Sequence, residues 1–259
     1  MKRVAEALNI VIPMAGRGSR FSQVGYDVPK PFIPIHGRPM IEWVIDNLRP
    51  ARPHRFVFLC LADHLEQFDV VERLAALAPE AEVVVVDAVT EGAACTVLLA
   101  AHLIDSAAPL MIANSDQWID TSIDAYLEAG DRSTDAGLIM TMWADHPKWS
   151  YVRLDDAGRV VEVVEKQVVS NEATVGIYNF ARGADYVRAA EAMIARDLRV
   201  NGEFYVAPTY NELLADGAEI AFVNIGRVDH EVRGLGTPGD LEAFIASPVS
   251  QRSARAGFA

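Results

Sequence analysis

A glycine- and arginine-rich turn follows the first apolar segment of the chain, and a lysine between two prolines comes shortly after it. The turn reads Ala15-Gly16-Arg17-Gly18-Ser19-Arg20, and the lysine is Lys30, in Pro29-Lys30-Pro31. A glycine-rich turn at the end of a strand lets backbone N–H groups approach a phosphate closely. The prolines restrict the backbone at Lys30, so its ammonium can be aimed with little further loss of entropy. These residues fit a site that holds a triphosphate and stabilises charge on a phosphorus during transfer.

Three other interpretations of this glycine-rich turn are a simple surface turn, a dinucleotide-binding loop and a Walker loop. A simple turn with two surface arginines would account for the glycine pair taken alone, because such pairs are common. The dinucleotide fingerprint G-x-G-x-x-G is excluded, since Phe21 stands where the third glycine belongs. A Walker loop is excluded too, since no Gly-Lys-Ser/Thr sequence follows.

The elements that must position these residues alternate between strand and helix in the first half of the chain. Valine-rich runs such as the one before Asp87 suit strands that are buried on both faces. The alternation predicts a parallel sheet with helices on both faces. The predicted strands are Leu8–Pro13, Arg55–Leu61, Glu82–Asp87 and Leu110–Ala113, and the predicted helices are Pro39–Leu48, His64–Leu77 and Gly92–Ile104.

The second half of the chain is richer in strands. A turn is expected at Asp155-Asp156-Ala157-Gly158, between two of them. We predict one α/β domain over residues 1–246, with a nucleotide-binding first half and an acceptor-binding second half, and a frayed polar tail over residues 247–259. The predicted strands are Gly137–Trp143, Tyr151–Leu154, Val160–Glu165, Thr174–Phe180 and Glu219–Asn224, and the predicted helices are Tyr186–Arg196, Val206–Ala215 and Pro238–Ile245.

Composition narrows the class of protein. The 259 residues are 51% hydrophobic and carry a formal charge of −13, which argues against a nucleic-acid binder. No apolar run reaches the roughly 18 residues that a membrane helix needs, and polar residues interrupt the N-terminal apolar stretch. We therefore expect a cytoplasmic protein without membrane contact. Cys60 and Cys95 lie in apolar surroundings, which predicts buried free thiols rather than a zinc site or a disulfide.

The combined pattern is similar to the signature of a known family. Gly16-Arg17-Gly18-Ser19-Arg20 with Pro29-Lys30-Pro31 resembles the G-x-G-[ST]-R and P-K-P motifs of the nucleoside-triphosphate transferases, the sugar-1-phosphate nucleotidyltransferases. The segment Ile35–Ile41 resembles the strand and helix entry that follow the lysine in that family, and matches extend to Gly236-Thr237-Pro238. The resemblance implies a Rossmann-like mixed sheet, mostly parallel and flanked by helices. It also implies transfer from a nucleoside triphosphate to a phosphorylated acceptor, with Mg²⁺ and release of pyrophosphate.

Residue roles on the nucleotide side follow from the resemblance. It implies catalytic roles for Arg20, Lys30 and Asp116, and Asp116 would hold the Mg²⁺; a helix-capping aspartate is the alternative. Asp87 lies where the family often has a base-contacting glutamine, and a carboxylate there could accept from cytosine or guanine; a solvated aspartate at a strand end is the alternative. The predicted nucleotide-binding residues are Ala15, Gly16, Arg17, Gly18, Ser19, Asp87, Glu91 and Gly92.

Residue roles on the acceptor side follow in the same way. Glu165-Lys166 resembles the family's E-K pair, in which the glutamate holds an acceptor hydroxyl and the lysine the acceptor phosphate; a surface ion pair is the alternative. Gly176 matches a glycine-centred strand of the acceptor pocket. The segment Asn201–Tyr205 matches one that closes over the acceptor, or else caps a helix. The predicted acceptor-binding residues are Glu165, Lys166, Gly176, Asn201, Glu203 and Tyr205.

One departure from the family pattern concerns the metal. The family commonly places a second metal carboxylate two residues before Gly-Thr, and this chain has Gly234 there. Three alternatives follow: Asp116 holds Mg²⁺ with phosphates and water alone, another acid such as Asp229 or Asp240 supplies the second carboxylate, or the protein no longer catalyses the transfer. Because the family's carboxylate is absent, the sugar-phosphate acceptor that is usual in the family is also open to question.

Three functions remain open from the sequence. The first is a nucleotidyltransferase acting on a sugar 1-phosphate, which would serve nucleotide-sugar and surface-polysaccharide synthesis. The second is a cytidylyltransferase acting on a non-sugar phosphate, such as a phosphorylated amino acid or alcohol. The third is a non-catalytic regulatory subunit on the same fold, and the retention of Arg20, Lys30 and Asp116 counts against it. A homo-oligomer is compatible with all three.

Overall fold

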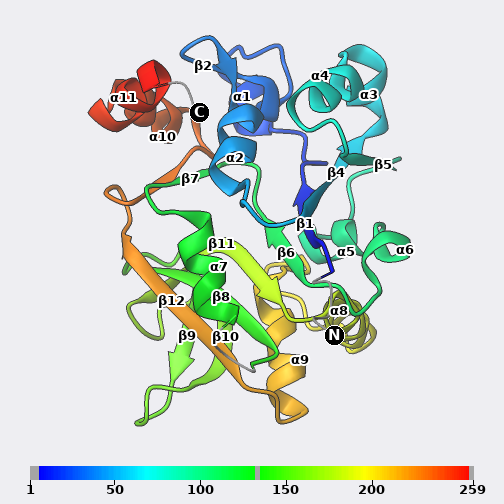
Figure 1. The fold of residues 1–259 in the computed structure, drawn as a ribbon, viewed down its shortest axis with the longest axis vertical. Helices are drawn as coiled ribbons and strands as arrows, with labels where there is room; N and C mark the ends of the chain where they lie inside the picture. The colour runs from blue at the N-terminus through cyan, green and yellow to red at the C-terminus, as the bar shows by residue number, and fades with distance from the viewer. Residues whose placement is uncertain (1–5, 132–134, 257–259) are drawn as a thin grey trace.

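A nine-stranded mixed sheet forms the centre of the molecule in the computed structural model, which describes residues 6–131 and 135–256. Along the main path the strand order is β10-β9-β11-β6-β1-β4-β5, and β8 joins β11 to β12. The four strands of the first half pair in parallel, and β11 is antiparallel to β6, β8 and β9. The predicted mixed sheet flanked by helices is thus confirmed (Figure 1).

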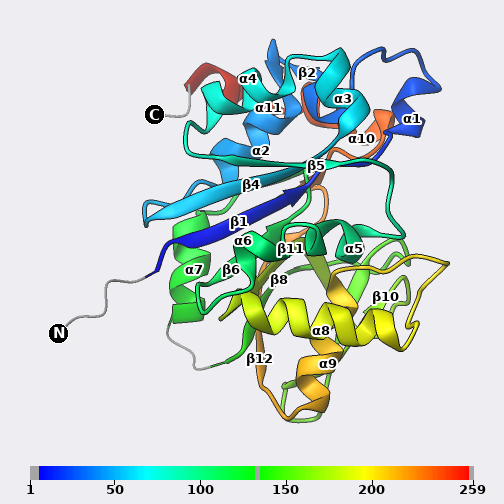
Figure 2. The same cartoon turned by 90° about the vertical axis from the view of Figure 1, so that its right-hand side faces the viewer.

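The first half forms the parallel part of the sheet. Its helices lie on both faces, with α2, α3 and α4 on one side of β1, β4 and β5 and with α5 and α6 on the other (Figure 2). The strands are β1 (Leu8–Pro13), β4 (His54–Leu61), β5 (Glu82–Val86) and β6 (Leu110–Ala113), and the helices are α1 (Ser19–Ser22), α2 (Met40–Leu48), α3 (Ala62–Gln67), α4 (Val70–Leu77), α5 (Ala93–Leu98) and α6 (Ala101–Ile104). A 3₁₀ turn η1 (Lys30–Phe32) and the short hairpin β2 (Pro34–Ile35) and β3 (Arg38–Pro39) precede α2.

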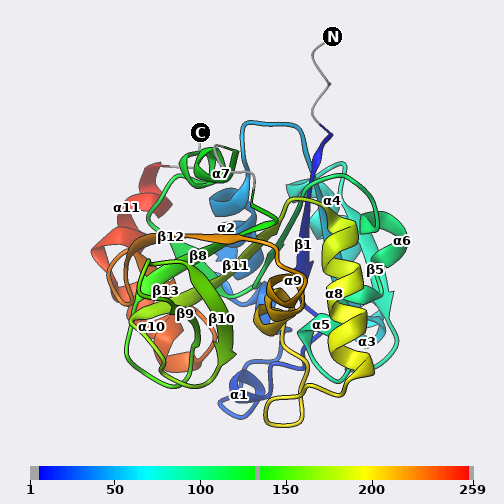
Figure 3. The same cartoon turned by 90° about the horizontal axis from the view of Figure 1, so that it is seen from below.

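The second half adds the antiparallel strands and covers them with helices. Helices α8 and α9 pack against one another, with α8 beside α5 and α6 (Figure 3). The strands are β7 (Gln117–Ile119), β8 (Gly137–Trp143), β9 (Ser150–Leu154), β10 (Val160–Glu165), β11 (Glu172–Phe180), β12 (Ile220–Arg227) and β13 (Val232–Gly234). The helices are α7 (Ile123–Asp131), α8 (Gly183–Ala195), α9 (Tyr210–Ala215), α10 (Pro238–Ala246) and α11 (Pro248–Ala256), with a 3₁₀ turn η2 (Ala207–Thr209) before α9.

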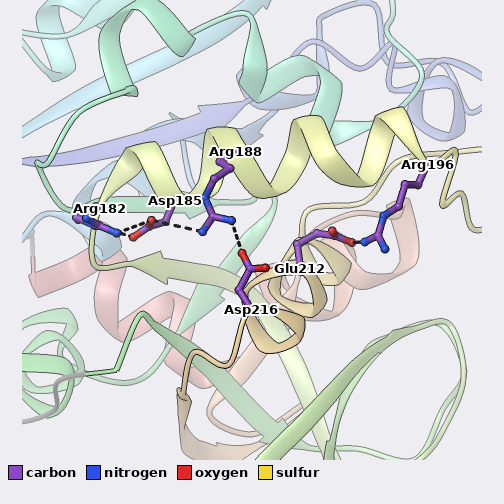
Figure 4. Close-up of polar contacts among 6 residues, drawn as sticks. All are labelled: Arg182, Asp185, Arg188, Arg196, Glu212 and Asp216. Atoms are coloured by element: carbon purple, nitrogen blue, oxygen red, sulfur yellow. Dashed lines mark hydrogen bonds and ion pairs between the residues drawn. The ribbon is translucent and has the colours of Figure 1, made fainter.

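Ion pairs built on arginine hold α8 against α9. Arg182 donates to Asp185 at 2.7 Å, Arg188 bridges to Asp216, and Arg196 pairs with Glu212 (Figure 4). Asp185 is buried, so its charge depends on these partners. The Arg188 and Arg196 pairs join α8 to the α9 segment, whereas the Arg182–Asp185 pair lies at the start of α8 itself.

The core divides into two layers because the strands are apolar on both faces. Alternate residues of β1 point to opposite sides, so Ile10 and Ile12 pack with α2 residues, whereas Val11 packs with Val97 and Ile104. All of these side chains are nearly inaccessible to solvent. No helix within residues 6–131 and 135–256 is long and apolar enough to cross a membrane.

Several predicted elements differ in detail. The predicted helix His64–Leu77 is two helices, because Phe68 adopts an extended backbone between α3 and α4. The predicted helix Gly92–Ile104 likewise breaks into α5 and α6 around Ala100. Residues 248–256 form helix α11 rather than a frayed tail, and residues 257–259 lie outside the described part. Ser250 anchors α11, since it is buried and bonded to carbonyls of Ile245 and Ser247.

The two cysteines also differ from one another. Cys60 on β4 is a buried free thiol, as predicted, and burial raises its pKa to about 12. Cys95 on α5 is free but only half-buried, so its predicted burial is wrong in degree. Neither thiol belongs to the site described below.

Candidate active site

The glycine-rich turn lies at the carboxyl end of β1, where ligands of α/β sheets are commonly found. Gly18 has a φ of 61°, in the left-handed region that glycine adopts without strain. A Cβ atom at Gly18 would lie 3.2 Å from the Cβ of Lys30. The absence of a side chain at Gly18 therefore lets the turn and the proline-flanked lysine come together, as the spacing of the two motifs predicts.

Lys30 forms an ion pair with Asp116 at the carboxyl end of β6. Its Nζ donates to Asp116 Oδ2 at 2.7 Å, and only about a fifth of each side chain is exposed (21% and 22%). Pro29 precedes η1, so Lys30 begins a short turn of fixed backbone geometry. The Asp116 carbonyl accepts from the Leu235 N–H at 2.8 Å. Both charged groups are thus held by backbone structure.

Asp116, the partner of Lys30, lines a cavity of about 460 Å³. Six residues of the predicted site line it: Arg20, Asp116, Glu165, Lys166, Gly176 and Tyr205. Its remaining lining comes from Ala93, Asn114, Gln117, Lys148, Trp149, Ser150, Thr174, Tyr178, Val206, Ala207, Gly234, Gly236, Thr237 and Asp240. The structure thus brings two of the predicted catalytic residues to the same cavity as four of the predicted acceptor-binding residues.

Glu165 and Lys166 lie at the end of β10 and are neighbours in this cavity. Glu165 is 5% exposed in its side chain, accepts from the Ser150 hydroxyl, and lies 3.3 Å from the Lys166 ammonium. That ammonium also lies 4.2 Å from the centre of the Tyr205 ring. Burial acts to lower the pKa of Lys166, but contacts with Tyr205 and Glu165 outweigh it, so the pKa lies above its ordinary value. Lys166 therefore stays cationic at neutral pH.

Gly176 lines the cavity at a point where there is no room for a side chain. Its φ is 86°, and a Cβ there would lie 2.3 Å from Asn114 Nδ2 and 2.6 Å from Gln117 Oε1. The Gly176 carbonyl accepts from the Asn114 N–H at 3.0 Å. Asn114 and Gln117 are lining residues that the sequence analysis did not assign, although both flank Asp116 at the end of a buried strand. That position was the signal that could have found them.

The segment after α8 forms a hairpin that connects the two sides of the cavity. Val200 and Glu203 bridge across a tight turn at Asn201 and Gly202, and both turn residues have positive φ. Next to it, the Phe204 N–H donates to the Glu91 carbonyl at 2.8 Å. The Phe204 carbonyl in turn accepts from the Ala94 N–H at 3.0 Å. Tyr205, the following residue, reaches the Lys166 ammonium.

Other predicted residues lie away from the cavity lining. Asn201 and Glu203 are exposed in the hairpin turn. Arg17 pairs with Asp63 at 3.2 Å on the surface, and Asp87 is exposed after β5. The Glu91 carboxylate pairs with Arg199 at 2.9 Å. Among the other predicted nucleotide-binding residues, Ala15 is buried, Gly16 and Ser19 are exposed in the turn, and Gly92 packs against the Phe204 backbone. Their roles in nucleotide binding stay predictions.

The metal-binding capacity of the site rests on few carboxylates. Within residues 6–131 and 135–256, no group of three or more histidine, cysteine, aspartate or glutamate residues is placed to hold a metal ion. A Cβ at Gly234 would lie 3.9 Å from Asp240 Oδ2, so Asp240 faces the space where the family pattern has its second carboxylate. Asp240 accepts from the Thr237 hydroxyl at 2.7 Å at the start of α10. Asp229 is not among the lining residues. A site with one or two carboxylates suits Mg²⁺ that is also bound by substrate phosphates.

Comparison with known proteins agrees with this geometry. Residues 10–200 match the family described as nucleotidyl transferase. The chain is 29% identical over 256 residues to the bifunctional protein GlmU of Burkholderia mallei (strain SAVP1), covering 95% of this chain and 52% of that protein. It is 27% identical over 224 residues to the bifunctional protein GlmU of Cupriavidus necator, covering 82% and 46%. The chain thus spans about half the length of these curated relatives.

Solved structures share the fold. A nucleoside-diphosphate-sugar pyrophosphorylase from Vibrio cholerae RC9 superposes with a TM-score of 0.80 at 27% identity, covering 92% of this chain and 100% of that one. The inositol-1-phosphate CTP transferase from T. maritima superposes with a TM-score of 0.75 at 17% identity, covering 98% and 99%. At that identity the second likeness concerns the fold alone. Taken with the match over residues 10–200, the glycine-rich turn and the Lys30–Asp116 pair, these results show that the chain belongs to the nucleotidyl transferase family.

Proposed function

We propose that the protein transfers a nucleoside monophosphate from a nucleoside triphosphate to a phosphorylated acceptor, with a sugar 1-phosphate as the favoured acceptor. The observation that carries the proposal is the single cavity that joins the Lys30–Asp116 pair to the Glu165–Lys166 pair. One pair suits a polyphosphate and the other suits a phosphorylated hydroxyl compound. Their shared cavity would bring the two substrates into contact.

The reaction is an in-line displacement at the α-phosphorus. An oxygen of the acceptor phosphate forms the new P–O bond, and the bond between the α-phosphorus and the bridging oxygen to the β-phosphorus breaks, so that pyrophosphate leaves. A phosphate monoester is already an anionic nucleophile near neutral pH, since its second pKa is about 6. The site therefore needs positioning and charge stabilisation more than a general base.

Three cationic residues, Lys30, Arg20 and Lys166, have a place in this scheme. Lys30 and Arg20 stabilise the triphosphate and the charge that develops around the attacked phosphorus. Lys166 holds the acceptor phosphate, and the buried Glu165 accepts from an acceptor hydroxyl. When bound, Mg²⁺ would neutralise charge on the triphosphate oxygens. Asp116 is the residue that would hold it, with Asp240 facing the same cavity.

A second acceptor class is favoured by one observation. The family pattern has a carboxylate where this chain has Gly234, and a Cβ at that position would lie 4.0 Å from the Trp149 ring. The cavity wall therefore differs from the pattern of the sugar-phosphate enzymes at this point. A cytidylyltransferase acting on a non-sugar phosphate is the alternative function.

The test is pyrophosphate release across a panel of nucleoside triphosphates and phosphorylated acceptors. The panel should contain hexose 1-phosphates and small phosphorylated alcohols and amino acids, each with Mg²⁺. We expect release with one triphosphate and a hexose 1-phosphate, and release that is lost on Lys30→Ala. Release with a non-sugar phosphate alone would select the alternative acceptor class. A folded protein that is inactive with every pair would overturn the proposed activity and favour a regulatory subunit.

A further inference from the structure

Lysine is rare in this chain and concentrated at the cavity. The sequence has only four lysines, Lys2, Lys30, Lys148 and Lys166, among 23 basic residues. Lys148 and Lys166 line the cavity, Lys30 pairs with a lining residue, and Lys2 lies outside the described residues. Elsewhere the cations of the described ion pairs are arginines, as between α8 and α9 (Figure 4). Of the three lysines at the cavity, only Lys148 has no place in the proposed reaction.

The backbone around Lys148 places it beside the acceptor pair. Lys148 lies just before β9, and its N–H donates to His146 Nδ1 at 3.1 Å. The carbonyl of the next residue, Trp149, accepts from the Lys166 N–H at 3.1 Å. Ser150 and Glu165 then face each other in the β9–β10 ladder. The segment that carries Lys148 is therefore bonded directly to the Glu165-Lys166 segment.

Both lining lysines are held against aromatic rings. The Lys148 ammonium lies 4.8 Å from the centre of the Trp149 ring, and the Lys166 ammonium lies 4.2 Å from that of Tyr205. A cation–π contact restricts the flexible lysine chain and keeps the ammonium at the aromatic face. Two cations are thus presented on the walls of one cavity.

The two lysines differ in how their charge is balanced. Lys166 has Glu165 at 3.3 Å, and Lys30 has Asp116 at 2.7 Å. Among the described residues, no carboxylate lies within ion-pair distance of the exposed Lys148. In a protein with a charge of −13, an unpaired ammonium on a cavity wall creates a local site for an anion.

We propose that Lys148 binds a second acidic group of the acceptor, a carboxylate, while Lys166 holds the acceptor phosphate. This inference rests on the proposed function and, among its possible acceptors, favours phosphorylated compounds that also carry a carboxylate. Gly234 is consistent with it, because no side chain at that position places a further negative charge beside Trp149. A neutral hexose 1-phosphate leaves the Lys148 ammonium without a partner.

The experiment compares matched acceptors that differ only in the second acidic group. Glucose 1-phosphate is paired with glucuronic acid 1-phosphate, and phosphoethanolamine with phosphoserine. KM and kcat are measured by pyrophosphate release, and acceptor binding is measured by calorimetry in the presence of a non-hydrolysable triphosphate analogue. The variants are Lys148→Met, which removes the charge, and Lys148→Arg, which keeps it. Arg227→Ala is the matched control, since that guanidinium stacks on Trp143 at 4.6 Å and lies outside the cavity lining.

In the wild-type protein we expect one carboxylate-bearing acceptor to bind more tightly than its neutral counterpart. Lys148→Met should raise the KM and Kd of that acceptor about tenfold, because the variant loses one solvent-exposed, charge-assisted contact. Lys148→Arg should retain most of the affinity, and Arg227→Ala should change nothing. The triphosphate KM and the affinity for the neutral counterpart should stay at wild-type values in every variant.

Three results would overturn the inference. An equal loss with both members of a pair would mean that Lys148 contacts the acceptor phosphate. A raised triphosphate KM would place Lys148 on the nucleotide side, and unchanged constants would leave it a surface residue. If pyrophosphate is released at the same rate in the Lys148 variants as in the wild type, this inference is wrong but the proposed function stands. If acceptor binding depends on Lys148 but no pyrophosphate is released, the proposed function is wrong but the second anion site stands.

Discussion

The Nζ atom of Lys30 lies 2.7 Å from Oδ2 of Asp116, although the two residues are 86 positions apart in the chain. One is the predicted phosphate-stabilising cation and the other the predicted metal ligand. Each therefore neutralises the other before any substrate binds. A triphosphate that binds the Lys30 ammonium would free Oδ2 of Asp116 for a metal ion. Triphosphate binding and metal binding should therefore depend on one another.

Lys30→Ala should lower kcat by about 10²–10³-fold, because a preorganised charge aimed at the reacting phosphorus is lost. Lys30→Arg should be nearly as defective, since a planar guanidinium does not replace a compact ammonium held after Pro29. Steady-state pyrophosphate release measures both. Arg153→Ala, which removes an exposed ion pair with Glu162, is the control. Wild-type turnover in folded Lys30→Ala would show that Lys30 has no part in the reaction.

Metal binding should depend on nucleotide, and this can be followed without turnover by the electron paramagnetic resonance signal of free Mn²⁺. The wild-type protein should bind Mn²⁺ weakly alone and more tightly with a triphosphate analogue. Lys30→Met should bind Mn²⁺ more tightly than wild type when no nucleotide is present, because Asp116 Oδ2 is then unpaired. Asp116→Asn should bind poorly in both conditions. If the wild type and Lys30→Met bind Mn²⁺ with equal affinity in the absence of nucleotide, Lys30 does not compete with the metal for Asp116.

Lys166→Ala should raise the acceptor KM far more than the triphosphate KM, because its ammonium lies at the end of the cavity that we propose for the acceptor. The raised pKa of Lys166 sets the pH dependence. Below the ordinary lysine pKa of about 10.4 the ammonium stays protonated. Its contribution to acceptor binding and to stability is thus fully present at neutral pH and is lost as the pH rises through the raised value. A wild-type acceptor KM that climbs between pH 7 and 9, with no such climb in Lys166→Ala, would contradict this.

Gly92→Ala should destabilise the fold more than Gly158→Ala. Both glycines have positive φ, 139° and 77°, so both substitutions carry a cost in backbone conformation. A Cβ at Gly92 would also lie 2.3 Å from the Phe204 carbonyl oxygen, whereas nothing lies within 4 Å of one at Gly158. We expect a loss of about 1–3 kcal/mol beyond that of the control, measured by urea unfolding. Equal losses of stability in the two variants would mean that the Phe204 backbone shifts to accommodate the new Cβ without a cost in free energy.

Local pattern was sufficient to predict most strands of the central sheet and the strand ends at which the candidate site lies. The apolar runs of β1, β4 and β6 are so strong that their bounds follow closely from the sequence, and β1 and β6 deliver the glycine-rich turn and Asp116 to one edge. The short β7 and β13 were missed, because their pairing joins residues more than 100 positions apart. Helix α11 was missed because its composition is polar, and its anchor is the tertiary burial of Ser250.

The acceptor side could be predicted only in part for a related reason. Glu165-Lys166 taken alone would be a surface ion pair, and its strand-end position together with its order among the family's motifs predicted a pocket position. The pair does line the cavity. Lys148 and Trp149 lie in an irregular segment whose sequence carries no periodic signal, and only the ladder between β9 and β10 brings them to the cavity. Asn201 and Glu203 were assigned to the pocket because the segment Asn201–Tyr205 resembles the family segment that closes over the acceptor. The tight turn instead points this part of the segment outward and leaves Tyr205 inside.

The backbone bonds of Phe204 have a consequence for how the two substrates influence each other. This one residue is bonded to the Glu91 carbonyl and the Ala94 N–H on the nucleotide side, and its neighbour Tyr205 touches Lys166 on the acceptor side. Any ligand that shifts this residue acts on both ends of the cavity at once. Thermodynamic linkage then requires reciprocity: whatever factor the triphosphate contributes to acceptor affinity, the acceptor returns to the triphosphate. The backbone of Phe204 thus links the affinity for the triphosphate and the affinity for the acceptor to one another.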